Sequence, residues 1–490
     1  MSTPTTTFEL APDPVAVAAG WLVLAVWEGE QPTDGAAAVD GAASGVISRL
    51  IASGDATGKL FELVPVLNAT GIAAKRILLT GLGRRDAATR QTVHDAMAAA
   101  ARFVTTKQVG TLAALVPSPD MVLATGVGVA QGCSGPGIRK TTPTRFAPDR
   151  LILTGIPAET DLNRVWAEAR ALWLARELVN TPPCDLYPET FASRATEVGQ
   201  SAGFEVEIWD EGKLAAERMG ALLGVAQGSA RPPRLIVLRY TANPGGPTLG
   251  LVGKGVTFDS GGLSLKTTEQ MVDMKCDMAG AACVLAGVAA VAELKLRVNL
   301  LGVLAVVENM PGGRAFKLGD VLTARNGKTI EILNTDAEGR LILADALSYA
   351  ADQKVNHLVD FATLTGACMI ALGPHVTGLM TNNDPWGERV LAAIGRAGER
   401  AWKLPLDASY DEMIRSKVAD MRNTGGSRYG GAITAAKLLQ QFVADVPWAH
   451  LDIAGPSWAE AETPALDPGG TGCMVRSIVE LATHYGERGA

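Results

Sequence analysis

Short apolar runs alternate along the chain with amphipathic or alanine-rich stretches. The runs at residues 77–82, 249–253, 300–307 and 356–361 have the length and the aliphatic content of buried strands. The stretches between them are long enough for helices that cross from one strand to the next. This alternation is typical of α/β layers with mainly parallel strands. We therefore predict an α/β protein in which helices cover a central sheet.

One amphipathic stretch marks the expected domain boundary. Residues 161–179 place Val165, Trp166 and Leu172 on one face of a predicted helix, and the following Pro182 and Pro183 end it. A length of 490 residues suggests roughly three domains, or two if one is large. We predict a smaller amino-terminal α/β domain (1–155), a linking helix (156–180) and a larger carboxy-terminal α/β domain (181–490) with a mixed central sheet covered by helices.

Charge and cysteine usage narrow the class of protein. The net charge of −7 is concentrated before Arg49, where six acidic residues and no basic residue occur, so no strong positive field exists to hold a nucleic acid. The six cysteines form no C-x-x-C pair, which is typical of reduced cytoplasmic thiols. The uncharged stretch 278–292 has 15 residues, fewer than the about 20 that a membrane span needs. We expect a cytoplasmic protein with no membrane or nucleic-acid partner.

Several common catalytic motifs are missing from the sequence. The five histidines form no H-E-x-x-H pair, which argues against a histidine-built zinc site. Ser260 lies in FDSGG and not in the G-x-S-x-G motif of many serine hydrolases. Lys254 and Gly255 resemble the start of a dinucleotide-binding loop, but Phe258 takes the place of its third glycine. These classes of enzyme therefore lose support.

Carboxylates instead gather next to predicted strands and helix starts. Asp259 follows the run 249–253, and ligands of open parallel sheets bind at the carboxyl ends of strands. Asp277 precedes an alanine-rich helix, where a plain N-cap is the alternative. Asp336 and Glu338 are two residues apart, so both would point the same way in an extended segment, although acids are also common at helix starts for structural reasons. Together the three groups indicate a ligand site.

The octapeptide NTDAEGRL at residues 334–341 resembles the signature of the leucyl aminopeptidase (cytosol aminopeptidase) family. Four other segments resemble that family in order and spacing: VGKGVTFDSGG at 252–262, MKCDMAGAA at 274–282, ATLTGA at 362–367 and GAITAA at 431–436. The resemblance covers residues 180–490, whereas the amino-terminal part is similar to the family only in length and layout.

The resemblance implies a centre of two divalent metal ions. One ion would be held by Lys254, Asp259, Asp277 and Glu338, and the other by Asp259, Asp336 with its main-chain carbonyl, and Glu338. Oxygen ligands suit Mn²⁺, our first choice, or Mg²⁺, while Zn²⁺ stays an alternative. A ligating Lys254 has to be a neutral amine, which burial and adjacent cations favour.

The same resemblance implies roles for seven further residues. Lys266 would polarise the scissile carbonyl and stabilise the oxyanion, and Arg340 would hold a bicarbonate that relays a proton. The implied pocket for an apolar, leucine-like side chain consists of Met274, Thr363, Leu364, Gly366 and Ala454. For Met274, packing in the core is the alternative.

The leading hypothesis is a metal-dependent aminopeptidase that removes leucine and other, mostly apolar, residues from peptides. A free amine can bind a metal ion, whereas an internal amide nitrogen is a poor ligand. A two-metal phosphoesterase is an alternative based on the same carboxylates. A nucleic-acid-binding regulator is another, because some members of the family bind DNA, but the acidic amino-terminal segment argues against it. The resemblance also implies a homohexamer.

Overall fold

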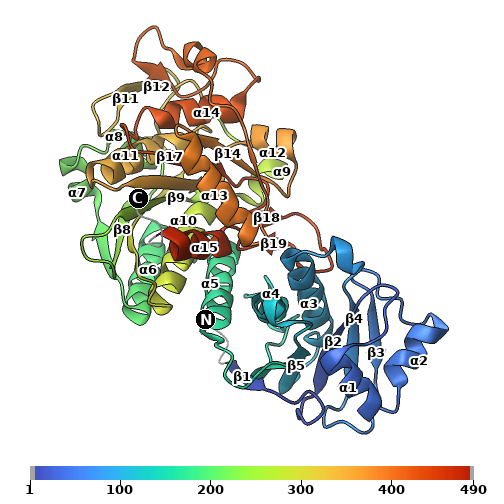
Figure 1. The fold of residues 1–490 in the computed structure, drawn as a ribbon. Helices are drawn as coiled ribbons and strands as arrows, with labels where there is room; N and C mark the ends of the chain where they lie inside the picture. Colours follow the sequence, from blue (N-terminus) through green and yellow to red (C-terminus); the bar gives the residue numbers. More distant parts are fainter. Residues whose placement is uncertain (1–5, 486–490) are drawn as a thin grey trace. The chain divides into compact units, whose positions relative to one another are not determined.

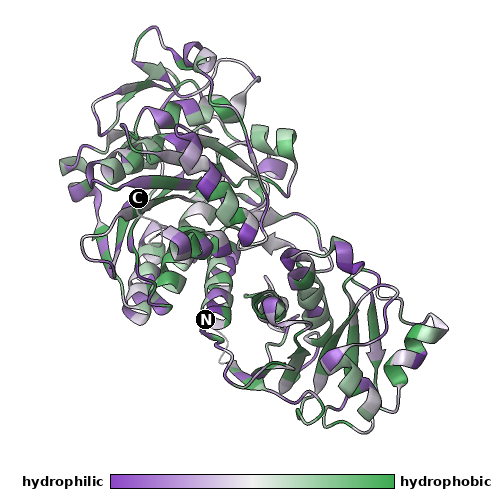
Figure 2. Ribbon diagram, in the orientation of Figure 1, coloured by the Kyte–Doolittle hydropathy of each residue, from purple (hydrophilic) through white to green (hydrophobic). Residues whose placement is uncertain are grey.

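The computed structural model describes residues 6–485 and shows two compact units (Figure 1). The first unit runs to Trp173 and also contains Glu460–Pro468, and the second contains Leu174–Ala459 and the chain from Gly469 onward. The chain passes from the first unit to the second within one helix, α5 (Asn163–Asn180). In both units hydrophobic residues are concentrated in the strands of the sheets (Figure 2).

The first unit is built on a six-stranded sheet with the order β1-β6-β5-β2-β4-β3. Every pairing in it is parallel except that of β3 with β4. The central strand β2 has the sequence WLVLAV and is buried nearly throughout, as expected for a parallel strand covered on both faces. The strands are β1 (Thr7–Ala11), β2 (Trp21–Val26), β3 (Leu63–Val66), β4 (Ile77–Gly81), β5 (Thr111–Leu115) and β6 (Arg150–Thr154), and the helices are α1 (Asp34–Ala42), α2 (Val46–Ser53), α3 (Arg90–Val104) and α4 (Val122–Gly132).

An ion-pair network around the buried Arg102 fixes Glu460–Pro468 within the first unit. The guanidinium of Arg102, at the end of α3, lies 2.6 Å from Glu462 Oε1 and 2.7 Å from Asp467 Oδ1. Arg145 donates to the same Asp467 oxygen at 2.7 Å. The apolar pattern gives no indication of this return of the chain, because it depends on charged side chains far apart in sequence.

The second unit has an eight-stranded sheet with the order β15-β14-β17-β13-β9-β10-β8-β7. The four inner strands β17, β13, β9 and β10 are parallel. Strands β7 and β8 pair antiparallel with their neighbours, and β14 pairs antiparallel with β17 but parallel with the edge strand β15. The strands are β7 (Glu205–Trp209), β8 (Arg234–Thr241), β9 (Thr248–Asp259), β10 (Asn299–Asn309), β13 (His357–Ala362), β14 (Thr377–Thr381), β15 (Ala401–Lys403) and β17 (Trp448–Asp452). The predicted fold class, two α/β units with a mixed sheet in the larger one, is confirmed.

Helices and small sheets complete the second unit. Its helices are α6 (Pro188–Ala202), α7 (Glu211–Ala216), α8 (Gly220–Ala226), α9 (Thr268–Met271), α10 (Ala279–Glu293), α11 (Gly339–Asp352), α12 (Gly366–Leu372), α13 (Asp384–Arg396), α14 (Gly431–Gln440) and α15 (Val475–Tyr485). Two small sheets contain β11 (Val321–Thr323), β12 (Thr329–Glu331) and β16 (Met421–Arg422), and β18 (Trp458–Ala459) and β19 (Gly469–Gly470).

Helix α10 packs closely on the inner strands. A Cβ added to Gly280 would lie 2.0 Å from the carbonyl oxygen of Phe361 in β13, so only glycine permits this approach. Within the described residues, Thr268–Glu293 is the one segment long and apolar enough to cross a membrane, but 89% of its most apolar window is buried inside the protein. A helix that is apolar all round and buried in this way is a core helix.

Candidate metal centre

Strand β9 supplies two charged side chains to the carboxyl edge of the inner sheet. The strand is longer than the predicted run and extends through Lys254 to Asp259, its last residue. Both side chains are almost fully buried, with exposed fractions of 3% and 2%. Because β9 lies between the parallel strands β10 and β13, its end lies at the edge where ligands of such sheets bind.

Asp277 lies between a short 3-10 turn, Met274–Cys276, and helix α10. The simple N-cap role considered for it is wrong, because Met278 occupies the N-cap position and no side chain caps the helix. The Oδ1 atom of Asp277 instead lies 2.7 Å from Lys254 Nζ and accepts a hydrogen bond of 2.7 Å from Thr363 Oγ1. The carboxylate is thereby turned toward the end of β9.

The octapeptide connects β12 to α11 through a turn. The extended conformation expected for Asp336 and Glu338 is wrong, since Asn334 Oδ1 accepts the Asp336 N–H at 2.8 Å and the Ala337 N–H bonds to the Asn334 carbonyl. This arrangement is an Asx turn. Glu338 takes the N-cap position of α11 without capping it and is 1% exposed. The turn brings the carboxylates together although the segment is not extended.

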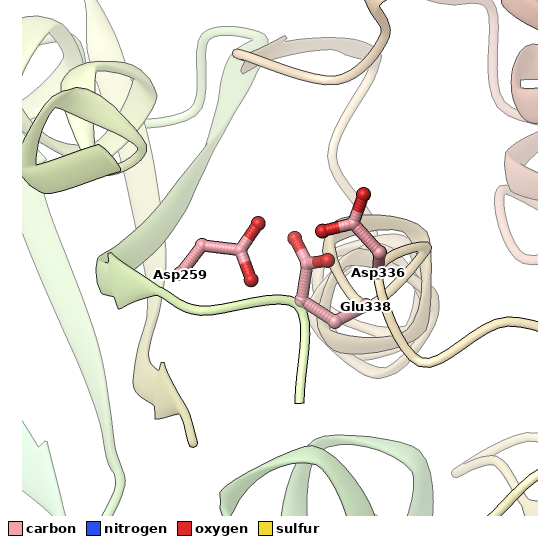
Figure 3. Close-up of side chains that lie close together, drawn as sticks. All are labelled: Asp259, Asp336 and Glu338. Carbon is pink, nitrogen blue, oxygen red and sulfur yellow. The ribbon is translucent and has the colours of Figure 1, made fainter. Parts of the chain in front are cut away.

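The structure brings all of these side chains into one cluster. Carboxylate oxygens of Asp259, Asp336 and Glu338 lie within 4.8 Å of one another, and the three groups point toward a common centre (Figure 3). Lys254 Nζ lies 2.7 Å from Asp277 Oδ1 and 3.0 Å from Glu338 Oε1. The five residues predicted as metal ligands therefore meet at one place.

Lys266 joins the same cluster from the loop that follows β9. Its Nζ lies 2.8 Å from Asp259 Oδ2 and also forms an ion pair with Asp336. The lysine is buried, with 14% of its side chain exposed. Burial would lower the pKa of Lys266, but the carboxylates of Asp259 and Asp336 outweigh that effect and raise it.

The cluster contains more negative than positive groups. Burial raises the pKa of Glu338 to about 8, reinforced by the charge of Asp259, and raises the pKa of Asp277 to about 6 against the opposing charge of Lys254. Within residues 6–485, Asp277 Oδ2 and Glu338 Oε2 are buried and have no hydrogen-bond partner. Buried oxygens that are short of positive charge fit a divalent cation, because they are the ligands that hard cations take.

Comparisons with known proteins identify the family. Residues 173–479 match the model of the cytosol aminopeptidase family, catalytic domain, and residues 23–134 match the family's N-terminal domain. The chain belongs to the cytosol aminopeptidase family. It is therefore an aminopeptidase, from a family whose members depend on metal ions.

Individual relatives agree with this membership. "Probable cytosol aminopeptidase" from Rhodopirellula baltica is 45% identical over 446 residues, which cover 88% of this chain and 86% of that protein. A solved mutant of tomato leucine aminopeptidase is 34% identical with a TM-score of 0.86 and covers 98% of this chain and 97% of its own. The bottromycin maturation enzyme BotP in complex with Mn is 35% identical with a TM-score of 0.84, covering 96% and 100%.

A second layer of residues orients the cluster of this aminopeptidase. Asn309 ends β10, the strand next to β9, where it is the register partner of Asp259. Its Nδ2 donates to Asp259 Oδ1 at 2.8 Å and to the Thr335 carbonyl at 3.0 Å. The Gly261 N–H also donates to Asp259 Oδ1. These bonds fix one oxygen of Asp259 and leave the other facing Lys266. Sequence reasoning missed Asn309, although the strand-end argument used for Asp259 applies to it equally.

Arg340 lies in the first turn of α11 with 8% of its surface exposed. Its Nη1 donates to the Asn423 carbonyl at 2.8 Å, while its Nε is buried without a partner within the described chain. Burial lowers the pKa of Arg340 to about 10, against the raising effect of Glu338. The Nδ2 of Asn423 also donates to both sides of the octapeptide turn, to the Asn334 carbonyl at 2.6 Å and to the Ala337 carbonyl at 3.4 Å, and its Oδ1 accepts the Leu333 N–H. No local signal in the sequence points to Asn423.

The predicted substrate residues lie on three segments around the cluster. Met274 is half-buried, so it is not a plain core residue. The Thr363 carbonyl accepts the Lys254 ammonium at 2.8 Å, which places Thr363 beside the cluster. Leu364 and Gly366 follow β13, and Ala454 follows β17, the neighbouring parallel strand.

Proposed function

We propose that this aminopeptidase hydrolyses the amino-terminal residue of peptides, leucine and other mostly apolar residues, with water activated by two divalent metal ions. The observation that carries the proposal is the convergence of Asp259, Asp336 and Glu338 together with the buried, unpartnered oxygens of Asp277 and Glu338. The four carboxylates of the cluster carry as many negative charges as two divalent cations carry positive ones.

The residues present fit such a pair of ions. Lys254, Asp259, Asp277 and Glu338 would hold one ion, and Asp259, Asp336 and Glu338 the other, so that Asp259 and Glu338 would contribute to holding both. Oxygen-rich ligands favour Mn²⁺, as does the Mn complex of the similar enzyme BotP, and Zn²⁺ and Mg²⁺ are the alternatives. When bound, two adjacent ions supply a nucleophilic water at neutral pH and polarise the substrate carbonyl.

The two lysines would act in different ways. Lys254 is buried in contact with Asp277 and Glu338. It would bind an ion as a neutral amine, because a cation held by these carboxylates would disfavour its ammonium form. Lys266 keeps its proton and reaches the cluster on the side of Asp336, the more exposed of its two carboxylate partners. It would donate to the carbonyl oxygen of the scissile bond and stabilise the oxyanion as charge develops there.

Arg340 would hold a bicarbonate next to the cluster. One of its nitrogens is already bonded to the Asn423 carbonyl, which fixes the plane of the guanidinium, and its Nε is left without a partner among residues 6–485. A guanidinium presents parallel N–H donors that match a planar oxyanion. Bicarbonate supplies a group that can accept a proton from the attacking water and return it to the leaving amine.

The substrate pocket would lie between Met274, Thr363, Leu364, Gly366 and Ala454. A pocket of this kind discriminates one methylene group by only about 1 to 3 kcal/mol, so we expect preference for leucine within a broad specificity. The free amino group of a peptide would bind a metal ion, which explains cleavage at the amino terminus.

We further propose that residues 181–490 form the catalytic domain and that the enzyme is a homohexamer. We also propose that it is cytoplasmic, in line with its relatives' name of cytosol aminopeptidase.

Chelation tests the proposal directly. Dialysis against a chelator should abolish hydrolysis of leucine p-nitroanilide, and Mn²⁺ should restore it. The N-acetylated substrate, which lacks the free amine, should resist cleavage in every condition and serves as the control. Activity that survives exhaustive chelation would contradict the metal mechanism, and hydrolysis of a phosphoester in place of the peptide analogue would favour the phosphoesterase alternative.

A further inference from the structure

Asp452 is a buried carboxylate that the proposed mechanism does not use. It is the last residue of β17 and is fully buried. Its register partner in the parallel strand β13 is Ala362, so the loops that follow the two strands begin side by side at the carboxyl edge of the sheet. Asp452 therefore lies beneath both loops.

The carboxylate of Asp452 bonds to each of these loops. Its Oδ1 accepts the main-chain N–H groups of Leu364 and Ala454, each at 3.2 Å. Its Oδ2 accepts the hydroxyl of Thr365 at 2.7 Å. The same hydroxyl accepts the Cys368 N–H at 3.1 Å and thereby caps the start of α12. One side chain thus ties together the loop after β13, the loop after β17 and the first turn of α12.

We propose that Asp452 is a positioning residue that sets the spacing of the substrate pocket and hence the side-chain preference of the enzyme. The inference rests on the proposed function, because Leu364 and Ala454 are substrate-binding residues only there. Both oxygens of Asp452 are used by protein donors, in contrast to Asp277 and Glu338, whose second oxygens have no partner among the described residues. Its role is therefore to hold the loops and not to bind a metal ion.

A carboxylate suits this role better than a neutral group. Hydrogen bonds from main-chain N–H groups to an ionised acceptor are about twice as strong as neutral ones. Asparagine at this position would carry no negative charge. Its side-chain NH₂ group would also face groups that are themselves hydrogen-bond donors, the main-chain N–H groups or the Thr365 hydroxyl. The two loops would then move apart or become mobile, while Asp259, Asp336 and Glu338, which lie on β9 and the octapeptide turn, keep their own contacts.

The test compares Asp452→Asn with Asp345→Asn. Asp345 is a matched control, because it is also fully buried in this unit and also accepts two main-chain N–H groups, those of Leu222 and Arg325, on segments that carry no predicted site residue. For Asp452→Asn we expect a KM for leucyl substrates that is raised roughly tenfold, with kcat changed by less than about threefold. The preference for leucyl over alanyl substrates should also fall. Asp345→Asn should leave KM and the preference unchanged.

Mn²⁺ titration by calorimetry supplies a readout other than activity. The affinity of Asp452→Asn for Mn²⁺ should equal that of the wild type, because Asp452 bonds to Leu364, Thr365 and Ala454 and to no predicted metal ligand. The inference is overturned if Asp452→Asn keeps the wild-type KM and leucine preference, if Asp345→Asn alters them equally, or if Mn²⁺ affinity falls together with kcat. Absence of metal-dependent activity in the wild type would instead refute the proposed function itself.

A second pair of variants applies if Asp452→Asn does not fold. Thr365→Val removes the hydroxyl bond to Asp452 and keeps the shape of the side chain, and Thr365→Ser keeps the hydroxyl. Thr365→Val should raise KM and weaken the leucine preference, and Thr365→Ser should retain wild-type values. Equal behaviour of the valine and serine variants would overturn the inference.

Discussion

Each of the two units contains a charged cluster with buried members, and the clusters differ in how their charges are matched. In the first unit, Arg102 and Arg145 meet Glu462 and Asp467, and each of these carboxylates has a guanidinium at 2.6 to 2.7 Å. In the second unit, four carboxylates share two lysines, and the oxygens Asp277 Oδ2 and Glu338 Oε2 find no partner among residues 6–485. Arg102, Arg145 and Asp467 are largely buried, like the second cluster, whereas Glu462 is exposed. An excess of charge is found only in the second cluster.

The pKa shifts express the same contrast. Burial alone would raise the pKa of Asp467, but the guanidinium groups of Arg145 and Arg102 outweigh it and lower the pKa. For Glu338, burial and the neighbouring Asp259 both act upward and raise the pKa to about 8. In a matched cluster each buried charge has a partner that offsets its desolvation, whereas an unmatched cluster costs stability until a cation binds. The comparison teaches that unbalanced charge, and not burial, distinguishes the candidate site.

The largest effect is expected for Glu338→Gln. Loss of a bridging ligand should reduce kcat by a factor on the order of a thousand or more, since the metal centre supplies several kcal/mol of transition-state stabilisation. The melting temperature of the metal-free protein should not fall, because the change removes a charge that has no full match. Glu331→Gln is the control: Glu331 lies in β12 and accepts a hydrogen bond from Ser416 outside the cluster. Near-normal kcat in Glu338→Gln would refute the site.

Lys266→Gln should have the next largest effect. Removal of one oxyanion donor typically lowers kcat by about a hundredfold to a thousandfold. Mn²⁺ binding should be kept or strengthened, since an ammonium that competes for Asp259 and Asp336 is lost. Lys275→Gln is a suitable control, because Lys275 donates to the Asn180 carbonyl and not to the cluster. Steady-state kinetics with leucine p-nitroanilide decide the matter, and unchanged kcat in Lys266→Gln would remove this residue from the mechanism.

Asp467→Asn tests the matched cluster. Breaking the pairs of Asp467 with Arg102 and Arg145 should lower the stability of the first unit by about 2 kcal/mol, since a buried guanidinium loses its counterion. Thermal unfolding measures this loss, and kcat with leucine p-nitroanilide should remain normal. Asp320→Asn, in an exposed pair with Lys317, should change stability by less than about 1 kcal/mol. A loss of activity without a loss of stability in Asp467→Asn would contradict the claim that this cluster contributes to stability and not to catalysis.

The smallest effect is the change in the free energy of unfolding per unit of pH. It compares the carboxyl of Asp467 with that of Asp345, a buried carboxylate held by main-chain N–H groups. Burial raises the pKa of Asp345 to about 7 from 3.8. Between these values the folded state binds more protons than the unfolded state, so the free energy of unfolding should fall by up to about 1.4 kcal/mol per unit as pH rises. The lowered pKa of Asp467 has the opposite sign: its stabilisation is present above its unfolded pKa and is lost as pH falls.

Denaturant unfolding of the wild type and of Asp345→Asn between pH 5 and about 7 measures this slope. The variant should lack the part of the decline that Asp345 causes. Parallel stability profiles of the two proteins would show that the carboxyl of Asp345 does not change its charge in this range.

The sequence was sufficient for the layers of the fold and for the members of the cluster, but not for their geometry. Apolar runs predict strands and do not specify their direction. The antiparallel pairings of β14 with β17 and of β8 with β10 could therefore not be predicted. Asp336 and Glu338 were expected to converge through an extended segment that is in fact a turn, so they lie together for a different local reason.

Residues that act through long-range contacts were the hardest to predict. Asn309 follows from the strand-end argument, but Asn423 and Asp452 acquire their roles from loops more than eighty residues away along the chain. The return of Glu460–Pro468 to the first unit depends on Arg102 in the same way. Contacts of this kind are set by the folded arrangement of strands and loops and leave no periodic pattern in the sequence.

The central claim is that the unmatched cluster holds two metal ions. Anomalous diffraction from crystals grown with Mn²⁺ tests it most directly, with Glu338→Gln crystals as the control. The account predicts two anomalous peaks in each chain, both within coordination distance of Asp259 and Glu338, and their loss or weakening in the variant. A wild-type map with no anomalous peak at these carboxylates would contradict the account.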